Sequence, residues 1–226
     1  MNKALLDPAV QKFVNEHLQD DISKLILKGS PFPEITEQEL AIQISGRRKA
    51  EKKLPTWFSN KNILYPPNLN LEQTSSETTA AYKADLISGE TIADLTGGFG
   101  IDSFYFSKKF EKVFHIEQNK ELSQIAAHNF SQLKAENIFP VLGDAIDFLK
   151  NSSERFDFLY VDPSRRDDHG GKVFHLDQCT PDVSEHLDLF FSKAENILLK
   201  TSPLLDLKAG ITQLKHVVEI HIVAVN

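Results

Sequence analysis

The chain has 226 residues, 41% of them hydrophobic and 25% charged, with a formal net charge of −7 and a mean hydropathy of −0.28. This balance excludes a disordered chain, and no apolar stretch is long enough to span a bilayer. An acidic surface also argues against non-specific binding of nucleic acid by the whole molecule. The single cysteine, Cys179, permits no internal disulfide, and the first residues lack the apolar run of a signal peptide, so we expect a cytoplasmic protein.

Residues 1–71 carry apolar side chains at helical spacing and predict an all-helical N-terminal module. Asp7 before Pro8 is typical of a helix start, and Thr36 with Glu39 three residues later indicates a capping box. The predicted helices cover 7–18, 21–29 and 36–54.

The basic run "GRRKAEKK" at 46–53 lies in the third of these helices. Most of its charges are expected on a solvated helix face, with contact to nucleic acid as the alternative. Trp57 and Phe58 follow Pro55 and are predicted to pack between the helical module and the rest of the chain.

Residues 72–226 begin with a helix near Ser75 and then alternate strand with helix. The predicted strands cover 91–96, 112–118, 138–144, 156–162, 196–203 and 217–225, and the helices between them cover 99–109, 119–135, 145–151, 182–194 and 206–214. Near-continuous apolar runs are typical of parallel strands buried on both faces. We therefore predict an α/β fold with a doubly wound, Rossmann-like, mostly parallel sheet, whose ligands bind beyond the carboxyl ends of its strands.

A glycine-rich turn, "TGGFG", follows the first predicted strand of this sheet. That strand ends at Asp94, and Glu117 ends the next strand 23 residues later. An acid at the second strand end suits hydrogen bonding to ribose hydroxyls, so a nucleoside ligand is predicted. A dinucleotide fingerprint would need a third glycine where Ser103 stands, which disfavours a nicotinamide or flavin cofactor.

The ordered motifs "ADLTGGFG" (93–100), "HIEQN" (115–119) and "GDA" (143–145) resemble those of class I S-adenosylmethionine-dependent methyltransferases. The resemblance implies S-adenosyl-L-methionine as cofactor, with its methionine part close to the glycine turn, its ribose on Glu117 and its adenine amino group toward Asp144. Thr96 departs from the pattern, because many members have glycine there. The residues implied in cofactor binding are Asp94, Thr96, Gly97, Gly98, Gly100, Glu117, Asp144 and Ala145.

The end of the fourth predicted strand, "LYVDPSRRD", resembles the Asp/Asn-Pro-Pro-aromatic motif of methyltransferases that modify amines. The resemblance implies that Asp162 and the backbone at Pro163 accept hydrogen bonds from the target amino group and aim its lone pair. Ser164 and Arg165 replace the second proline and the aromatic residue. Ser164, Arg165 and Arg166 are candidate substrate contacts, the arginines to phosphate; solvated arginines paired with nearby acids are the alternative.

The run "DPSRR…GGKVF" (162–174) followed by "CTPDV" (179–183) resembles a bacterial methyltransferase family that carries a THUMP-like RNA-binding module elsewhere in its chain, and "LEQTSSETTAAYKADLI" (71–87) is similar to the lead-in helix of that family. This resemblance implies methylation of an amine nitrogen, foremost on a base of rRNA or tRNA, with RNA as partner. A module that keeps the cofactor pocket without catalysis, and docks RNA or protein, is the alternative. No metal is expected, since the histidines show no ligand spacing and His115 is expected in the core.

The predicted strand at 217–225 runs up to Asn226. Methyltransferases of the resembled fold place an antiparallel seventh strand between the fifth and sixth. Without it the fifth strand would show an unpaired edge. We therefore expect these residues to be an N-terminal part of a longer protein, with direct pairing of the fifth and sixth strands, or a strand from a neighbouring chain, as alternatives.

Overall fold

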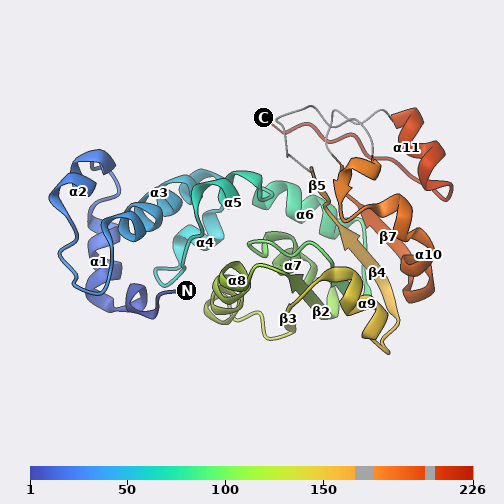
Figure 1. Ribbon diagram of the computed structural model, residues 1–226, viewed down its shortest axis with the longest axis horizontal. Coiled ribbons are helices and arrows are strands. Elements are labelled where there is room, and N and C mark those ends of the chain that lie inside the picture. The colour runs from blue at the N-terminus through green and yellow to red at the C-terminus, as the bar shows by residue number, and fades with distance from the viewer. Residues whose placement is uncertain (166–175, 202–206, 226) are drawn as a thin grey trace.

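The computed structural model describes residues 1–165, 176–201 and 207–225, and begins with a set of short helices (Figure 1). Asp7 caps the second of them by accepting a hydrogen bond from the backbone N–H of Ala9, and Thr36 and Glu39 form the predicted capping box. These elements are η1 (Lys3–Leu6), α1 (Pro8–Glu16), α2 (Ile22–Lys28), α3 (Glu37–Lys53), α4 (Pro55–Ser59) and α5 (Asn68–Gln73).

The basic run on α3 binds backbone carbonyl groups of neighbouring segments. The buried Arg47 guanidinium donates to the carbonyls of Phe58 and Asn60. Arg48 donates to two carbonyls just after α1, and Lys53 to two at the end of α5. The prediction of a solvated helix face is therefore wrong for these three side chains. Their charges satisfy carbonyls at or just beyond helix ends, where no following helical turn supplies an N–H donor.

A parallel five-stranded sheet forms the second half of the molecule, in the order β3-β2-β1-β4-β7. The predicted fold class is confirmed. The strands are β1 (Gly89–Asp94), β2 (Phe110–Glu117), β3 (Ile138–Leu142), β4 (Phe156–Val161) and β7 (Ala194–Leu199); the helices are α6 (Glu77–Asp85), α7 (Ile101–Phe106), α8 (Lys120–Gln132), α9 (Ala145–Asn151), α10 (Val183–Lys193) and α11 (Leu207–Leu214). A short antiparallel ribbon of β5 (Ser164–Arg165) and β6 (Cys179–Thr180), with η2 (Leu176–Gln178) before β6, follows β4.

Successive strand residues alternate between two buried clusters, one on each face of the sheet. On β1, Ile92 belongs to the cluster under α6, α7 and α8, whereas Ala93 belongs to the cluster under α9 and α10. The first cluster continues into the helical module, where the fully buried Trp57 packs edge-on against Phe104 at 4.8 Å between ring centroids. This confirms the predicted role of Trp57, and the half-buried Phe58 lies against the same cluster. The division of the chain at residues 71 and 72 stays a prediction.

Residues 217–225 do not form the predicted sixth strand; this prediction is wrong, and so is direct pairing of the fifth and sixth strands. Among the described residues β7 is an edge strand, and the C-terminal segment runs back from α11 toward α6, where His221 Nδ1 lies 2.7 Å from the hydroxyl of Tyr82. Val218 is 98% exposed and Ile222 84% exposed. Apolar alternation gives a segment the propensity for a strand, but a strand forms only beside a hydrogen-bonding neighbour.

No helix within the described ranges combines the length and the apolar character needed to cross a membrane.

Candidate functional site

A cavity of about 780 Å³ lies at the carboxyl ends of β1, β2 and β4, where the sequence predicted the ligand site. The cavity wall includes the turn after β1, the ends of β2 and β4, and the loop after β3. The segment between α5 and α6, β6 and the residues after β7 complete it. Of the predicted site residues, those that line this cavity are Thr96, Gly97, Gly98, Glu117, Asp144, Ala145, Asp162, Pro163 and Ser164.

The glycine turn packs so tightly against the sheet that two of its glycines have no room for a side chain. A Cβ on Gly97 would lie 2.5 Å from Nδ1 of His115, and a Cβ on Gly100 would lie 2.7 Å from Cε1 of Phe130 and still nearer to its Cζ. Gly98 and Gly100 also have φ values of +55° and +87°, a region that favours glycine. Gly98 lines the cavity with open space beside it, so the backbone itself forms this part of the wall.

Asp94 holds this turn from behind and lies outside the cavity lining, as Gly100 does. The fully buried carboxylate accepts a hydrogen bond from the backbone N–H of Thr96 at 3.1 Å and one from the hydroxyl of Ser103 at 2.6 Å. Burial raises the pKa of Asp94 to about 7, although both hydrogen bonds oppose the rise. The structure therefore makes Asp94 a support of the turn.

His115 is fully buried beneath Gly97, as the sequence predicted for a core position. Its Nδ1 lies 2.9 Å from the Ser103 hydroxyl, and its Nε2 has no hydrogen-bond partner among the described residues. Burial lowers the pKa of His115 to about 3, so the ring is neutral. Asp94, Ser103 and His115 thus form one polar chain under the turn.

Glu117 and Asp144 lie at the next two strand ends along the cavity. Glu117 accepts from the N–H of Gly98 at 2.9 Å and from the N–H of Asn119 at 2.7 Å, which ties the end of β2 to the glycine turn. Asp144 is the N-cap of α9 and accepts two backbone N–H groups through Oδ1. Both residues line the cavity, and each carboxylate also accepts backbone hydrogen bonds that hold the local structure.

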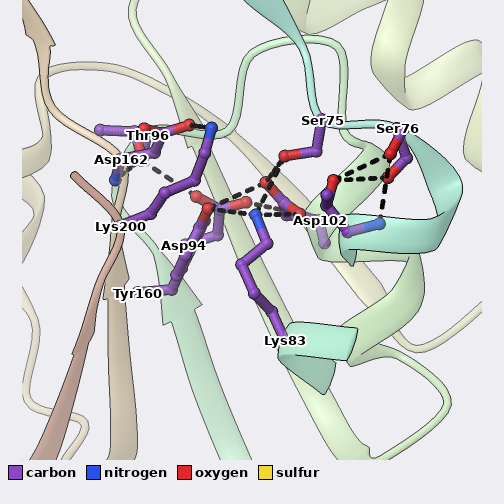
Figure 2. Close-up of polar contacts among 11 residues, drawn as sticks. Ser75, Ser76, Lys83, Asp94, Thr96, Asp102, Tyr160, Asp162 and Lys200 are labelled. Carbon is purple, nitrogen blue, oxygen red and sulfur yellow. Dashed lines mark hydrogen bonds and ion pairs between the residues drawn. The ribbon is translucent and has the colours of Figure 1, made fainter. Parts of the chain in front are cut away.

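Thr96, the departure from the glycine pattern, has a structural role. Its Oγ1 accepts a hydrogen bond from the backbone N–H of Asp162 at 2.8 Å, so it joins the end of β1 to the end of β4. Glycine could not make this bond. Asp162 also forms an ion pair with Lys200, and Nζ of Lys200 lies 2.5 Å from Oδ2 of Asp162 (Figure 2). Burial raises the pKa of Asp162, and Lys200 opposes that rise.

A buried polar cluster, formed by Ser75, Lys83, Asp102 and Tyr160, lies next to this pair (Figure 2). Lys83 Nζ lies 2.6 Å from Asp102 Oδ1 and donates to Ser75 Oγ and to the Tyr160 hydroxyl. Ser75 and Tyr160 each donate to Asp102 Oδ2 at 2.9 Å. Burial lowers the pKa of Lys83 and raises that of Tyr160 well above its usual value. The cluster joins α6, α7 and β4, and its members Ser75 and Asp102 line the cavity.

The segment after Asp162 is described only in part. Pro163 and Ser164 line the cavity, and Ser164 Oγ donates weakly to the carbonyl of Thr180 at 3.4 Å. The backbone of Arg165 belongs to β5, and Arg166 lies outside the described residues.

Sequence reasoning missed Lys200 and the whole buried cluster. Lys200 lies in the second half of the strand predicted at 196–203, and that position toward the carboxyl edge of the sheet was the one available indication of its place. In the described parts of the chain no group of three or more His, Cys, Asp or Glu side chains is placed to hold a metal ion.

Comparisons with known proteins agree with this fold. A crystal structure of a candidate methyltransferase from Porphyromonas gingivalis W83 superimposes with a TM-score of 0.80 at 28% identity, covering 93% of this chain and 52% of that one. An uncharacterized RNA methyltransferase of Mycoplasma mobile is 32% identical over 134 residues, covering 57% of this chain and 36% of the relative. No protein-family model matches. The chain therefore has the methyltransferase fold, and spans about half or less of the length of these relatives.

Proposed function

We propose that this chain is the cofactor-binding and catalytic part of an S-adenosylmethionine-dependent methyltransferase that modifies an amine nitrogen of an RNA base. The observation that carries the proposal is one cavity with the glycine turn and Glu117 on one side and Asp162 at the adjoining strand end. The methyltransferase fold and the likeness to an RNA methyltransferase of Mycoplasma mobile support it.

The cavity suits the proposed cofactor in shape and in donor set. Its open space beside Gly98 can accept a group that approaches the backbone closely, as nucleoside cofactors do in this kind of sheet. Glu117 would accept from the ribose hydroxyls, and the exposed Asp144 with the neighbouring Ala145 would meet the adenine. Thr96, Gly97 and Gly98 would lie along the methionine part, while Asp94 and Gly100 act from behind by shaping the turn.

Asp162 has the position and chemistry to orient an amine. S-adenosylmethionine, when bound, supplies a methyl group whose bond electrons remain on sulfur when a nitrogen attacks. Asp162 Oδ1 would accept one amine N–H and the backbone at Pro163 another, which aims the nitrogen lone pair at the methyl carbon. The proton that the nitrogen releases after transfer would pass to Asp162 or to water. This work is mainly positioning, because the methyl donor is already activated.

The choice of RNA belongs to the proposal as well. Ser164, Arg165 and Arg166 follow Asp162 and Pro163 in the sequence and would contact the substrate, the arginines through phosphate groups. We assign the helical residues 1–71 and the methyltransferase part 72–226 as the two units of the chain. We also propose that this chain works together with a THUMP-like module, which would add contacts to the RNA.

Radiolabelled S-adenosylmethionine and total RNA test the proposal. The chain should transfer labelled methyl groups to RNA, and Asp162→Ala, which removes the acceptor oxygens, should lower turnover about a hundredfold while cofactor affinity, measured by calorimetry, stays nearly unchanged. Asp85→Ala, which removes an exposed carboxylate paired with Lys109 and outside the cavity lining, is the matched control and should behave as the wild type.

Cofactor binding without any methylated RNA would contradict the catalytic proposal and favour the alternative, a silent module that keeps the cofactor pocket and docks RNA or protein.

A further inference from the structure

Lys200 is a cavity residue to which the proposed function assigns no task. It directly follows β7, its backbone N–H donates to the carbonyl of Val161 at 2.9 Å, and its ammonium group contacts Asp162 Oδ2. The side chains of Lys200 and Asp162 are 34% and 30% exposed, so water screens the pair only in part. The contact uses one oxygen of the carboxylate and leaves Oδ1 to the cavity.

We propose that Lys200 is the positioning residue that holds Asp162 ionised and turned so that Oδ1 faces the substrate amine. The inference rests on the proposed function and extends it to a residue on a different strand. The backbone of Asp162 is already fixed by Thr96 Oγ1, so the remaining freedom lies in its side-chain torsions. The ion pair with Lys200 removes that freedom.

The surroundings make a second cation necessary at this point. The carboxylates of Asp94, Asp102 and Asp162 come together with the Tyr160 phenol at the cavity, where Asp102 and Asp162 belong to the lining. Lys83 is the cation of the buried cluster. Lys83 is already engaged by Asp102, Ser75 and Tyr160. The charged or titratable described groups that act on Asp162 or Lys200, or belong to the same buried set, are Lys53 on α3, Lys83 on α6, Asp94 on β1, Asp102 on α7 and Tyr160 on β4.

Without the Lys200 charge, Asp162 would be a half-buried carboxyl with Asp102 as its acidic neighbour. Burial and Asp102 raise its pKa, whereas Lys200 and Lys83 lower it, with Lys200 the larger of the two. Loss of Lys200 therefore favours the protonated acid. A protonated Asp162 would donate its own hydrogen in place of accepting one from the amine, so methyl transfer should lose activity at the acid end of its pH range first.

The experiment measures the ionisation of Asp162 directly and its effect on turnover separately. Carboxyl carbon NMR on aspartate-labelled chain, with the resonance assigned by its loss in Asp162→Asn, gives the titration midpoint. In Lys200→Met the midpoint should rise by about 1 pH unit. This is the low end of the range of shifts expected when a contacting opposite charge is lost, because water partly screens the pair. Lys200→Arg should leave it near the wild-type value. Lys109→Met, which breaks an exposed Lys–Asp pair, is the matched control.

Turnover should follow the same shift. In Lys200→Met the acid limb of the profile of kcat against pH should shift to higher pH by the same amount, and kcat should recover in part at high pH. A merely structural role would lower kcat equally at every pH. An unmoved Asp162 midpoint, or an unmoved acid limb in an active variant, overturns the inference. A wild-type chain that methylates nothing would contradict the proposed function, and the NMR midpoint would still decide on the pair.

A second measurement covers the case in which Lys200→Met does not fold. The side-chain ¹⁵N resonance of Lys200 in the wild-type chain should titrate with the midpoint of Asp162, and this inflection should vanish in Asp162→Asn. A Lys200 resonance without an inflection at the midpoint of Asp162 would overturn the inference on its own.

Discussion

Replacing Gly97 with alanine should destabilise the protein through one specific clash. The added Cβ would lie 2.5 Å from Nδ1 and 2.7 Å from Nε2 of His115, distances that real Cβ atoms do not adopt. The His115 ring cannot move away easily, because it is fully buried and hydrogen-bonded to Ser103. It also packs edge-on against Phe130, with the ring centroids 5.1 Å apart. Overpacking of this kind costs about 1–3 kcal/mol, so the free energy of unfolding should fall by that amount.

Urea unfolding followed by circular dichroism measures this change, and Gly143→Ala is its matched control. Gly143 also lines the cavity, but a Cβ there meets nothing within 4 Å, so this variant should differ from the wild type by less than about 1 kcal/mol. In the double variant Gly97→Ala with His115→Ala the clash is gone, and its stability should not fall below that of His115→Ala. An unaltered Gly97→Ala, or a strictly additive double variant, would refute the clash as the cause.

Three further outcomes follow from the same contacts. Glu117→Ala should weaken S-adenosylmethionine binding by about 1–3 kcal/mol in calorimetry, since ribose hydroxyls lose a charged acceptor; undiminished affinity would remove Glu117 from the ribose. Because the pKa of Asp94 is raised to about 7 in the fold, the native state holds its proton more tightly than the unfolded chain. Its contribution to stability should therefore fall as pH rises from about 4 to 7, and unfolding curves of Asp94→Asn should lack this part of the slope. Arg48→Met should lower the free energy of unfolding by about 1–2 kcal/mol, because the two carbonyls just after α1 lose their donor. Lys52→Met, which removes an exposed side chain of the same helix, should leave that free energy unchanged. Equal free energies of unfolding in the two variants would contradict the structural role of Arg48.

Local patterns in the sequence predicted most elements of this fold within a few residues of their bounds. The strand–helix alternation after residue 90 predicted the five strands of the sheet and the helices α7 to α11, but not β5, η2 or β6, because hydrophobic period and helix caps are properties of short segments. The glycine turn and the acids after β1, β2 and β4 were likewise recognisable, since the carboxyl ends of parallel strands meet at one edge.

The same local reasoning failed where a partner decides the outcome. Residues 217–225 have a strand pattern and pair with no strand among the described residues. The arginines of α3 look like solvated charges, and Arg47 is 4% exposed because distant carbonyls need its donors.

The sequence by itself therefore determined the order of elements, the parallel sheet and the edge at which a ligand would bind. The tertiary structure alone decided which polar groups meet at that edge. Lys83 reaches Tyr160 across 77 residues of chain, and Lys200 reaches Asp162 across 38. No periodicity or cap encodes such pairs, because they arise only when buried charges from separate elements must find partners in the same small volume.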